Sequence, residues 1–136
     1  MKILINSKYY PLGEIIKSVA DDFNSGDEFC IYGDSLPLKG GKTYLVDDFP
    51  GIDENDQEIY PDSVTERGLN YLYSGQQFAD VVKNLVGQIR NPGANDFEMA
   101  LNYYSKNDCF LDFGKNREYL SFPWADYHLT LVERAL

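Results

Sequence analysis

The segment from Asp47 to Asp62, DDFPGIDENDQEIYPD, holds the side chains with the clearest potential for chemistry. It contains seven carboxylates and no Lys or Arg. Such a group of acids can bind a metal ion, bind a basic partner, or only be solvated. A calcium loop of the EF-hand type starting at Asp53 needs Gly and Glu where this sequence has Glu58 and Val64. An irregular calcium site remains open as an alternative, with ligands from Asp53, Asn55 and Asp56.

Elsewhere the sequence offers little support for catalysis. Asp108 and Asp112 lie in the strand-like run DCFLDF, where their even spacing places them on one face of a strand. With the loop carboxylates they define an alternative function, a metal-dependent hydrolase. The Gly-Lys-Thr at 41–43 lacks the Gly that a phosphate-binding loop needs, since Leu36 stands there. His128 is the only histidine and has no nucleophile motif beside it. We therefore expect no catalysis, no metal and no cofactor.

Length and composition favour a single globular domain spanning 1–136. Apolar residues make up 43% and aromatic residues 15% of the chain, which argues against disorder. A net charge of -10 disfavours nucleic acids and anionic membranes as partners. No apolar run is long enough for a membrane span, and the start MKILINSKYY lacks a signal-peptide core, so we expect a cytoplasmic protein. Cys30 and Cys109 lie in apolar runs, which predicts two buried thiols.

The negative charge is concentrated in one third of the chain. From Asp21 to Glu66 there are thirteen acidic residues and two basic ones, Lys39 and Lys42. The remainder has nine acidic and ten basic residues. A concentrated negative field steers cationic partners and raises their association rate.

Hydrophobic periodicity predicts alternating strands and helices. Strands are expected at 1–5, 28–33, 42–46, 69–73 and 108–113, and helices after Pro11, at 61–67, from Ser74 to Ile89 and at 97–105. Ser74 and Gln77 have the spacing of a capping box. The tail has an aromatic run at 119–124, and we expect a helix at 126–136. The predicted fold class is α/β or α+β, with a single mixed β-sheet of four to five strands packed with three to four helices.

Two segments resemble a known family. YPDSVTERGLNYLYSGQQFADVVKNL contains the run QQFADVVKNL at Gln76–Leu85, and ALNYYSKNDCFLDF contains ALNYY at Ala100–Tyr104. Both are similar to segments of small bacterial immunity proteins, which are encoded beside polymorphic or contact-dependent growth inhibition toxins. The resemblance covers roughly residues 29–113. It implies a protein that binds and neutralises a cognate toxin, often a nuclease, inside the producing cell.

The acidic segment agrees with that implication. A nuclease needs a basic cleft for phosphates, and a protein that blocks the cleft gains from carboxylates and aromatic contacts. Binding at a site beside the catalytic cleft remains an alternative. We expect an acidic, aromatic-flanked surface that binds a basic toxin; an acidic regulatory domain for another basic protein remains an alternative. The expected partner-binding residues are Asp47, Asp48, Asp53, Glu54, Asp56 and Glu58, with Asp62 and Glu66 at the border and Tyr60 and Tyr44 as aromatic contacts.

Overall fold

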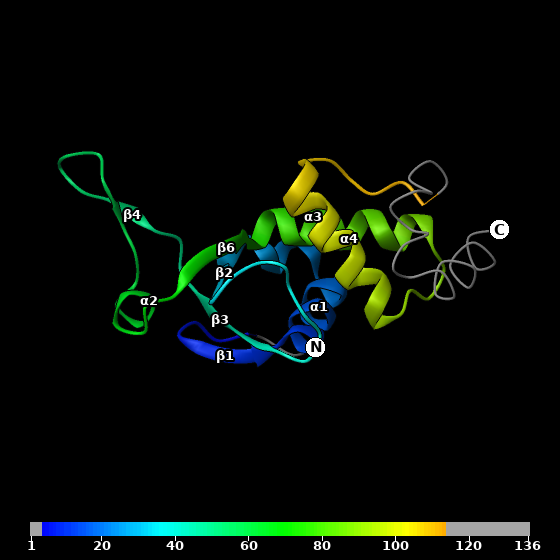
Figure 1. Cartoon of the computed structure of the whole chain (residues 1–136), viewed down its shortest axis with the longest axis horizontal. Coiled ribbons are helices and arrows are strands. Elements are labelled where there is room, and N and C mark those ends of the chain that lie inside the picture. Colours follow the sequence, from blue (N-terminus) through cyan, green and yellow to red (C-terminus); the bar gives the residue numbers. More distant parts are fainter. Residues whose placement is uncertain (1–3, 114–136) are drawn as a thin grey trace.

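The fold is built on a four-stranded sheet with the strand order β1-β3-β2-β6, accompanied by a small second sheet of β4 and β5 (Figure 1). The computed structural model describes residues 4–113. Both predicted tail segments and His128 lie outside these residues. The elements are β1 (Lys8–Pro11), α1 (Leu12–Asp21), the 3-10 helix η1 (Phe23–Glu28), β2 (Cys30–Gly33), β3 (Thr43–Asp47), β4 (Gly51–Ile52), β5 (Glu58–Ile59), α2 (Asp62–Glu66), β6 (Asn70–Ser74), α3 (Gly75–Gln88) and α4 (Ala94–Asn107).

The α+β class with a four-stranded main sheet is confirmed. The sheet is antiparallel at all three of its pairings rather than mixed. β1 and β2 run in the same direction and are joined through α1, as in a parallel crossover. β3 lies between β1 and β2 and is antiparallel to both, so β1 and β2 do not pair with each other.

The two faces of the sheet carry separate clusters of buried side chains. Ile31, Val46 and Tyr73 belong to the larger cluster, which packs under α1, α3 and α4. Cys30, Tyr32 and Leu45 belong to a smaller cluster. Neighbouring residues in a strand point to opposite faces, so one hydrophobic run supplies both layers. The smaller cluster is closed by residues from α2 and its surroundings: Val64, with Tyr60 and Leu69 packed against it.

The helices begin where the sequence supplies a start signal. Pro11 ends β1 and immediately precedes α1, where its missing N–H costs no hydrogen bond. The Ser74 hydroxyl accepts a 3.0 Å hydrogen bond from the Gln77 N–H and caps α3. At α4 the Asp96 carboxylate accepts a 2.6 Å hydrogen bond from the Gly93 N–H. These caps satisfy N–H groups that have no partner within the helix.

Two glycines allow η1 to approach the start of α3. A Cβ at Gly26 would lie 2.3 Å from the Gly75 carbonyl oxygen, and a Cβ at Gly75 would lie equally close to the carbonyl oxygens of Gly26 and Phe29. The Gly75 N–H also donates a 2.9 Å hydrogen bond to the Phe29 carbonyl. Gly26 in η1 and Gly75 at the start of α3 must therefore both be glycine for these two segments to pack so closely.

Two predicted strands differ from the structure. The first strand is Lys8–Pro11, and Leu4 and Ile5 are not in a strand. The prediction of a strand at 108–113 is wrong, because α4 continues to Asn107 and Asp108 then takes a left-handed conformation with φ 56°. As a result Cys109 is exposed rather than buried, whereas Leu111 still enters the core.

Candidate functional site

The most prominent surface feature is a projecting arm, which we define as residues 48–60. It leaves the sheet after β3, turns back at 53–57 and returns just before α2. Figure 1 shows the arm extending away from the body formed by the helices. β4 and β5 pair through Gly51 with Ile59 and Ile52 with Glu58. The predicted acidic loop is therefore a short β-hairpin.

Asp53 holds the turn at the tip of the arm. Its carboxylate oxygen Oδ1 accepts hydrogen bonds from the N–H groups of Asn55 (2.8 Å) and Gln57 (3.0 Å). Its N–H donates a 2.9 Å hydrogen bond to the Gln57 carbonyl, and Asp56 takes the left-handed conformation with φ 60°. Asp and Asn tolerate this conformation and favour such turns. The Asp53 carboxylate thus holds the turn of the arm, and the neighbouring carboxylates are exposed to solvent.

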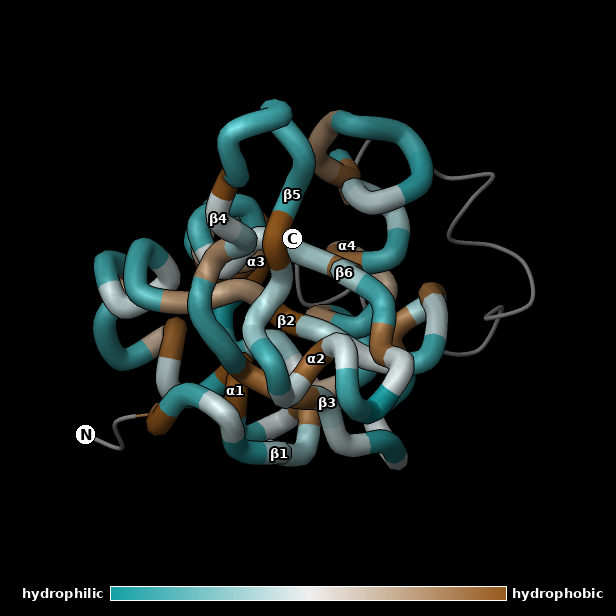
Figure 2. The backbone as a smooth tube through the Cα atoms, turned by 90° about the vertical axis from the view of Figure 1, so that its left-hand side faces the viewer, coloured by the Kyte–Doolittle hydropathy of each residue, from teal (hydrophilic) through white to brown (hydrophobic). Residues whose placement is uncertain are grey.

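The displayed carboxylates belong to four exposed residues of the arm, namely Asp48, Glu54, Asp56 and Glu58. No Lys or Arg occurs between positions 47 and 62 to neutralise them. Figure 2 shows the tip of the arm as a continuous hydrophilic stretch. These like charges protrude from the body and create a negative potential around the arm. A cationic surface can therefore contact the arm without any rearrangement of the body.

The arm also exposes large apolar side chains, which were not among the expected contact residues. Ile52 is 70% exposed, Ile59 is 54% exposed and Phe49 is 42% exposed. Ile52 is paired with Glu58 and Ile59 with Gly51, so the two isoleucines lie on opposite faces of the hairpin. The runs FPGI and EIY within the acidic segment are the signal that could have revealed them. Apolar side chains beside carboxylates are typical of surfaces that bind proteins.

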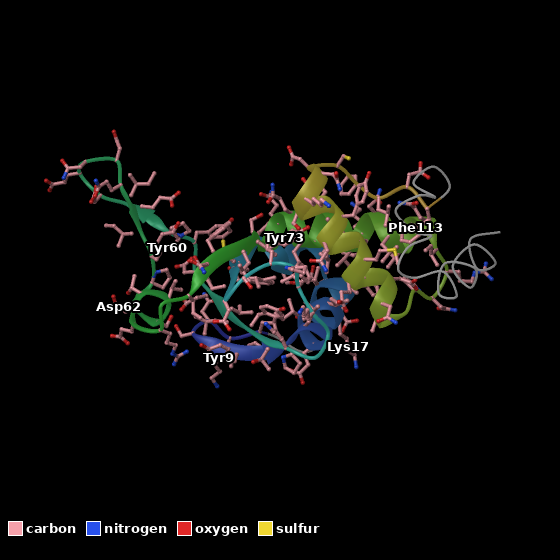
Figure 3. The ribbon with its side chains drawn as sticks, in the orientation of Figure 1. Tyr9, Lys17, Tyr60, Asp62, Tyr73 and Phe113 are labelled. Atoms are coloured by element: carbon pink, nitrogen blue, oxygen red, sulfur yellow. The ribbon has the colours of Figure 1, made fainter. Side chains whose placement is uncertain are left out.

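Three tyrosines join the base of the arm to the sheet. The buried ring of Tyr32 meets Tyr60 edge-on at a centroid distance of 6.2 Å and Tyr71 at 5.7 Å. Tyr60 is half-buried and donates a hydrogen bond to the Glu58 carboxylate; Figure 3 shows it where the arm meets the body. That bond raises the pKa of Tyr60, because it stabilises the neutral phenol beside a negative charge. Tyr71 is 41% exposed and completes an aromatic patch beside the arm.

Two of the predicted contact residues lie inside the fold. Tyr44 is buried, and its hydroxyl accepts a 2.8 Å hydrogen bond from the Lys39 N–H. Asp47 is buried as well and is enclosed by donors. Its carboxylate accepts hydrogen bonds from the Ser7 hydroxyl (2.8 Å), the Asp48 N–H (2.8 Å) and the Ser63 hydroxyl. Asp47 therefore fastens α2 and the N-terminal turn beneath the arm, as a buried carboxylate with full hydrogen bonding can do.

The remaining predicted contacts, Asp62 and Glu66, are exposed on the short helix α2. Figure 3 shows Asp62 at the base of the arm. The guanidinium of Arg67, the residue that follows α2, lies 5.1 Å from the centre of the Tyr9 ring on the edge strand β1. The structure thus brings eight of the ten predicted residues onto one end of the molecule and places two in the interior.

The carboxylates of the hydrolase alternative do not converge. Asp108 caps the end of α4, which Figure 1 shows well separated from the arm. Within residues 4–113, no three His, Cys, Asp or Glu side chains gather in a way that could hold a metal ion. In the same part of the chain, no helix has both the length and the apolar character of a membrane span.

Comparison with known proteins places residues 11–113 in one family. This segment matches the family described as "Domain of unknown function (DUF7716)". It includes α1 through α4, the whole arm and the aromatic patch at its base. No curated protein and no solved structure matches the chain.

Proposed function

The chain belongs to the DUF7716 family, and we propose that it is an immunity protein that binds and neutralises a basic toxin. In this proposal it acts in the cytoplasm of the producing cell, by binding and without catalysis. A nuclease is the toxin class that fits best, because a nuclease must present a basic cleft to its substrate. The arm takes the place of the phosphates in that cleft.

The observation that carries the proposal is the composition of the arm. Five carboxylates and three exposed apolar side chains share a thirteen-residue hairpin without a compensating cation. Solubility alone does not require such an arrangement, because scattered charges would serve it equally well. Carboxylates speed the capture of a basic partner, and the apolar side chains provide area to bury once contact is made.

The position of the arm supports insertion into a concave partner. Its base is fixed by the hydrogen bond from Tyr32 to the Asp48 carbonyl and by the contact of Tyr60 with Tyr32. Its tip is fixed by Asp53. A hairpin held at both ends loses little conformational entropy on binding, which preserves affinity.

The first test identifies the partner and then measures how far its binding depends on the arm. The tagged chain is purified from its native cells, and the bound protein is identified by mass spectrometry and assayed for toxicity. Its affinity for the wild-type chain is measured by calorimetry and its association rate by stopped flow. The arm variant combines Glu54→Gln, Asp56→Asn and Glu58→Gln, and leaves Asp53 intact because its carboxylate holds the turn. We expect association at low salt to slow about ten-fold.

A matched control removes the same net charge from the body. It combines Asp21→Asn, Asp80→Asn and Asp108→Asn, three exposed residues of α1, α3 and the end of α4. We expect near wild-type association for this variant. Equal effects of the two variants would show that only the overall charge matters and would remove the arm from the interface. A non-toxic basic partner would instead favour the regulatory alternative, and metal-dependent substrate turnover would favour the hydrolase.

A further inference from the structure

The edge strand β6 offers a second contact surface next to the arm. Within residues 4–113, no strand pairs with its outer side. β6 reads NYLYS and contains no charged residue and no proline. The opposite edge strand, β1, carries Lys8 and Pro11, which are common protections against unwanted strand pairing. β6 carries neither a charge nor a proline, and its pairing with β2 has one irregularity, a β-bulge at Leu72.

β6 is also held rigidly along its length. The Asn70 side chain donates a 2.8 Å hydrogen bond to the Asp34 carbonyl, and the Tyr73 hydroxyl donates a 3.0 Å hydrogen bond to the Leu101 carbonyl. Ser74 caps α3. An edge strand fixed at both ends is already ordered, so an added strand pays less entropy to pair with it.

The surroundings of β6 favour a basic occupant. Tyr71 packs on Tyr32, whose other aromatic neighbour, Tyr60, is bonded to Glu58. The sequence has no Lys or Arg between Arg67 and Lys83, so no cation of this segment offsets the nearby arm. Exposed tyrosine rings bind Arg and Lys side chains through cation–π contacts, and neighbouring carboxylates strengthen the attraction.

We propose that an extended, Arg- or Lys-bearing segment of the toxin pairs with β6 as a fifth strand of the sheet and places a cationic side chain against Tyr71. This inference rests on the proposed function, because it adds a second contact with the same partner. In this arrangement the arm captures the toxin, and β6 fixes the register of the complex through backbone hydrogen bonds.

The test uses defined peptides, so that it does not depend on the identity of the toxin. The full-length, ¹⁵N-labelled chain is titrated with acetyl-Arg-Val-Arg-Val-Arg-Val-amide and, separately, with the same peptide carrying Glu in place of Arg. We expect amide shifts at 70–74 with the Arg peptide only. Tyr71→Ala should weaken binding about ten-fold, the loss expected for a well-packed aromatic contact.

Tyr9→Ala is the matched control. Tyr9 and Tyr71 occupy opposite ends of one cross-strand row through Leu45 and Tyr32, and their exposed fractions are 44% and 41%. Tyr9→Ala should leave peptide binding unchanged. Absence of shifts at 70–74, equal shifts with the Glu peptide, or concentration-dependent shifts at β6 without peptide would overturn the inference. The last result would identify a second copy of the chain as the occupant. None of these results changes the comparison between the arm and body variants, which tests the proposed function separately.

Discussion

The phenol of Tyr32 donates a 2.7 Å hydrogen bond to the backbone carbonyl of Asp48. Tyr32 is buried in β2, at the centre of the sheet, and Asp48 is the first residue of the arm. A single side chain thus connects the rigid interior to the segment with the greatest concentration of charge. The direction in which the arm leaves the body depends on this connection, together with the Asp47 carboxylate one residue earlier.

Replacing Tyr32 with Phe should loosen the arm and leave the fold in place. The ring contacts with Tyr60 and Tyr71 remain, but the Asp48 carbonyl loses its donor. We expect the free energy of unfolding to fall by about 1 kcal/mol, and the amides at 48–60 to exchange faster with solvent. Urea titration and hydrogen exchange measure the two effects. Tyr60→Phe is the control, since the Tyr60 hydroxyl bonds to the exposed side chain of Glu58; a loss as large in that variant would contradict the role given to Tyr32.

Replacing Gly75 with Ala should destabilise the protein strongly. The new Cβ would lie 2.3 Å from two backbone carbonyl oxygens, so η1 and α3 would have to move apart. We expect a loss of about 2–3 kcal/mol in the free energy of unfolding, measured by urea titration. Gly87→Ala lies in the same helix, and among residues 4–113 no atom of another segment lies within 4 Å of the added Cβ. That control should gain about 0.5–1 kcal/mol, because Ala favours helix. A mild effect at position 75 would refute the close packing.

The stability of the protein should fall at alkaline pH, in part through Tyr71. Burial raises the pKa of Tyr71 from 10.0 to about 12. Its neutral form therefore stabilises the fold fully below pH 10, and this contribution is lost as the pH rises through about 12, because the unfolded chain ionises first. Tyr71→Phe should show a shallower decrease in this range. Urea titrations at a series of pH values measure the difference, and parallel curves for the two proteins would rule out a contribution from Tyr71.

The two cysteines should react with thiol reagents at very different rates. Cys109 is exposed, whereas Cys30 is buried and its pKa is raised, chiefly by burial. A thiol reacts as the thiolate, so a raised pKa and burial both slow the reaction of Cys30. Ellman's reagent should detect one thiol in the native protein and two in urea. The Cys109→Ser variant should show almost none before unfolding; rapid native labelling of that variant would place Cys30 nearer the surface.

The sequence alone predicted the elements that have a strong local signal. The apolar periodicity after Pro11 and after Ser74 located α1 and α3, and the capping spacing of Ser74 and Gln77 corresponds to a hydrogen bond in the structure. The acidic segment was recognised as a surface feature for a comparable reason. Seven carboxylates within sixteen residues cannot be buried together, so at least part of the segment has to face water.

The run at 108–113 shows the limit of this reasoning. DCFLDF alternates like a strand, but the chain leaves α4 through a left-handed Asp108, and within residues 4–113 this run pairs with no strand of either sheet. Alternation of apolar and polar residues indicates which side chains can be buried. Formation of a strand also needs a neighbouring strand to pair with, and the local sequence does not specify one.

What the sequence determined by itself is the charge, its concentration between Asp21 and Glu66, and the helical and extended tendencies of each segment. Only the tertiary structure decided that Asp47 and Tyr44 turn inward while Ile52 and Ile59 turn outward, and that Tyr60 and Tyr71 flank Tyr32. Local sequence sets conformational preference, but burial depends on which distant segments pack together. A carboxylate such as Asp47 is buried because Ser7 and Ser63, far away along the chain, supply its hydrogen bonds.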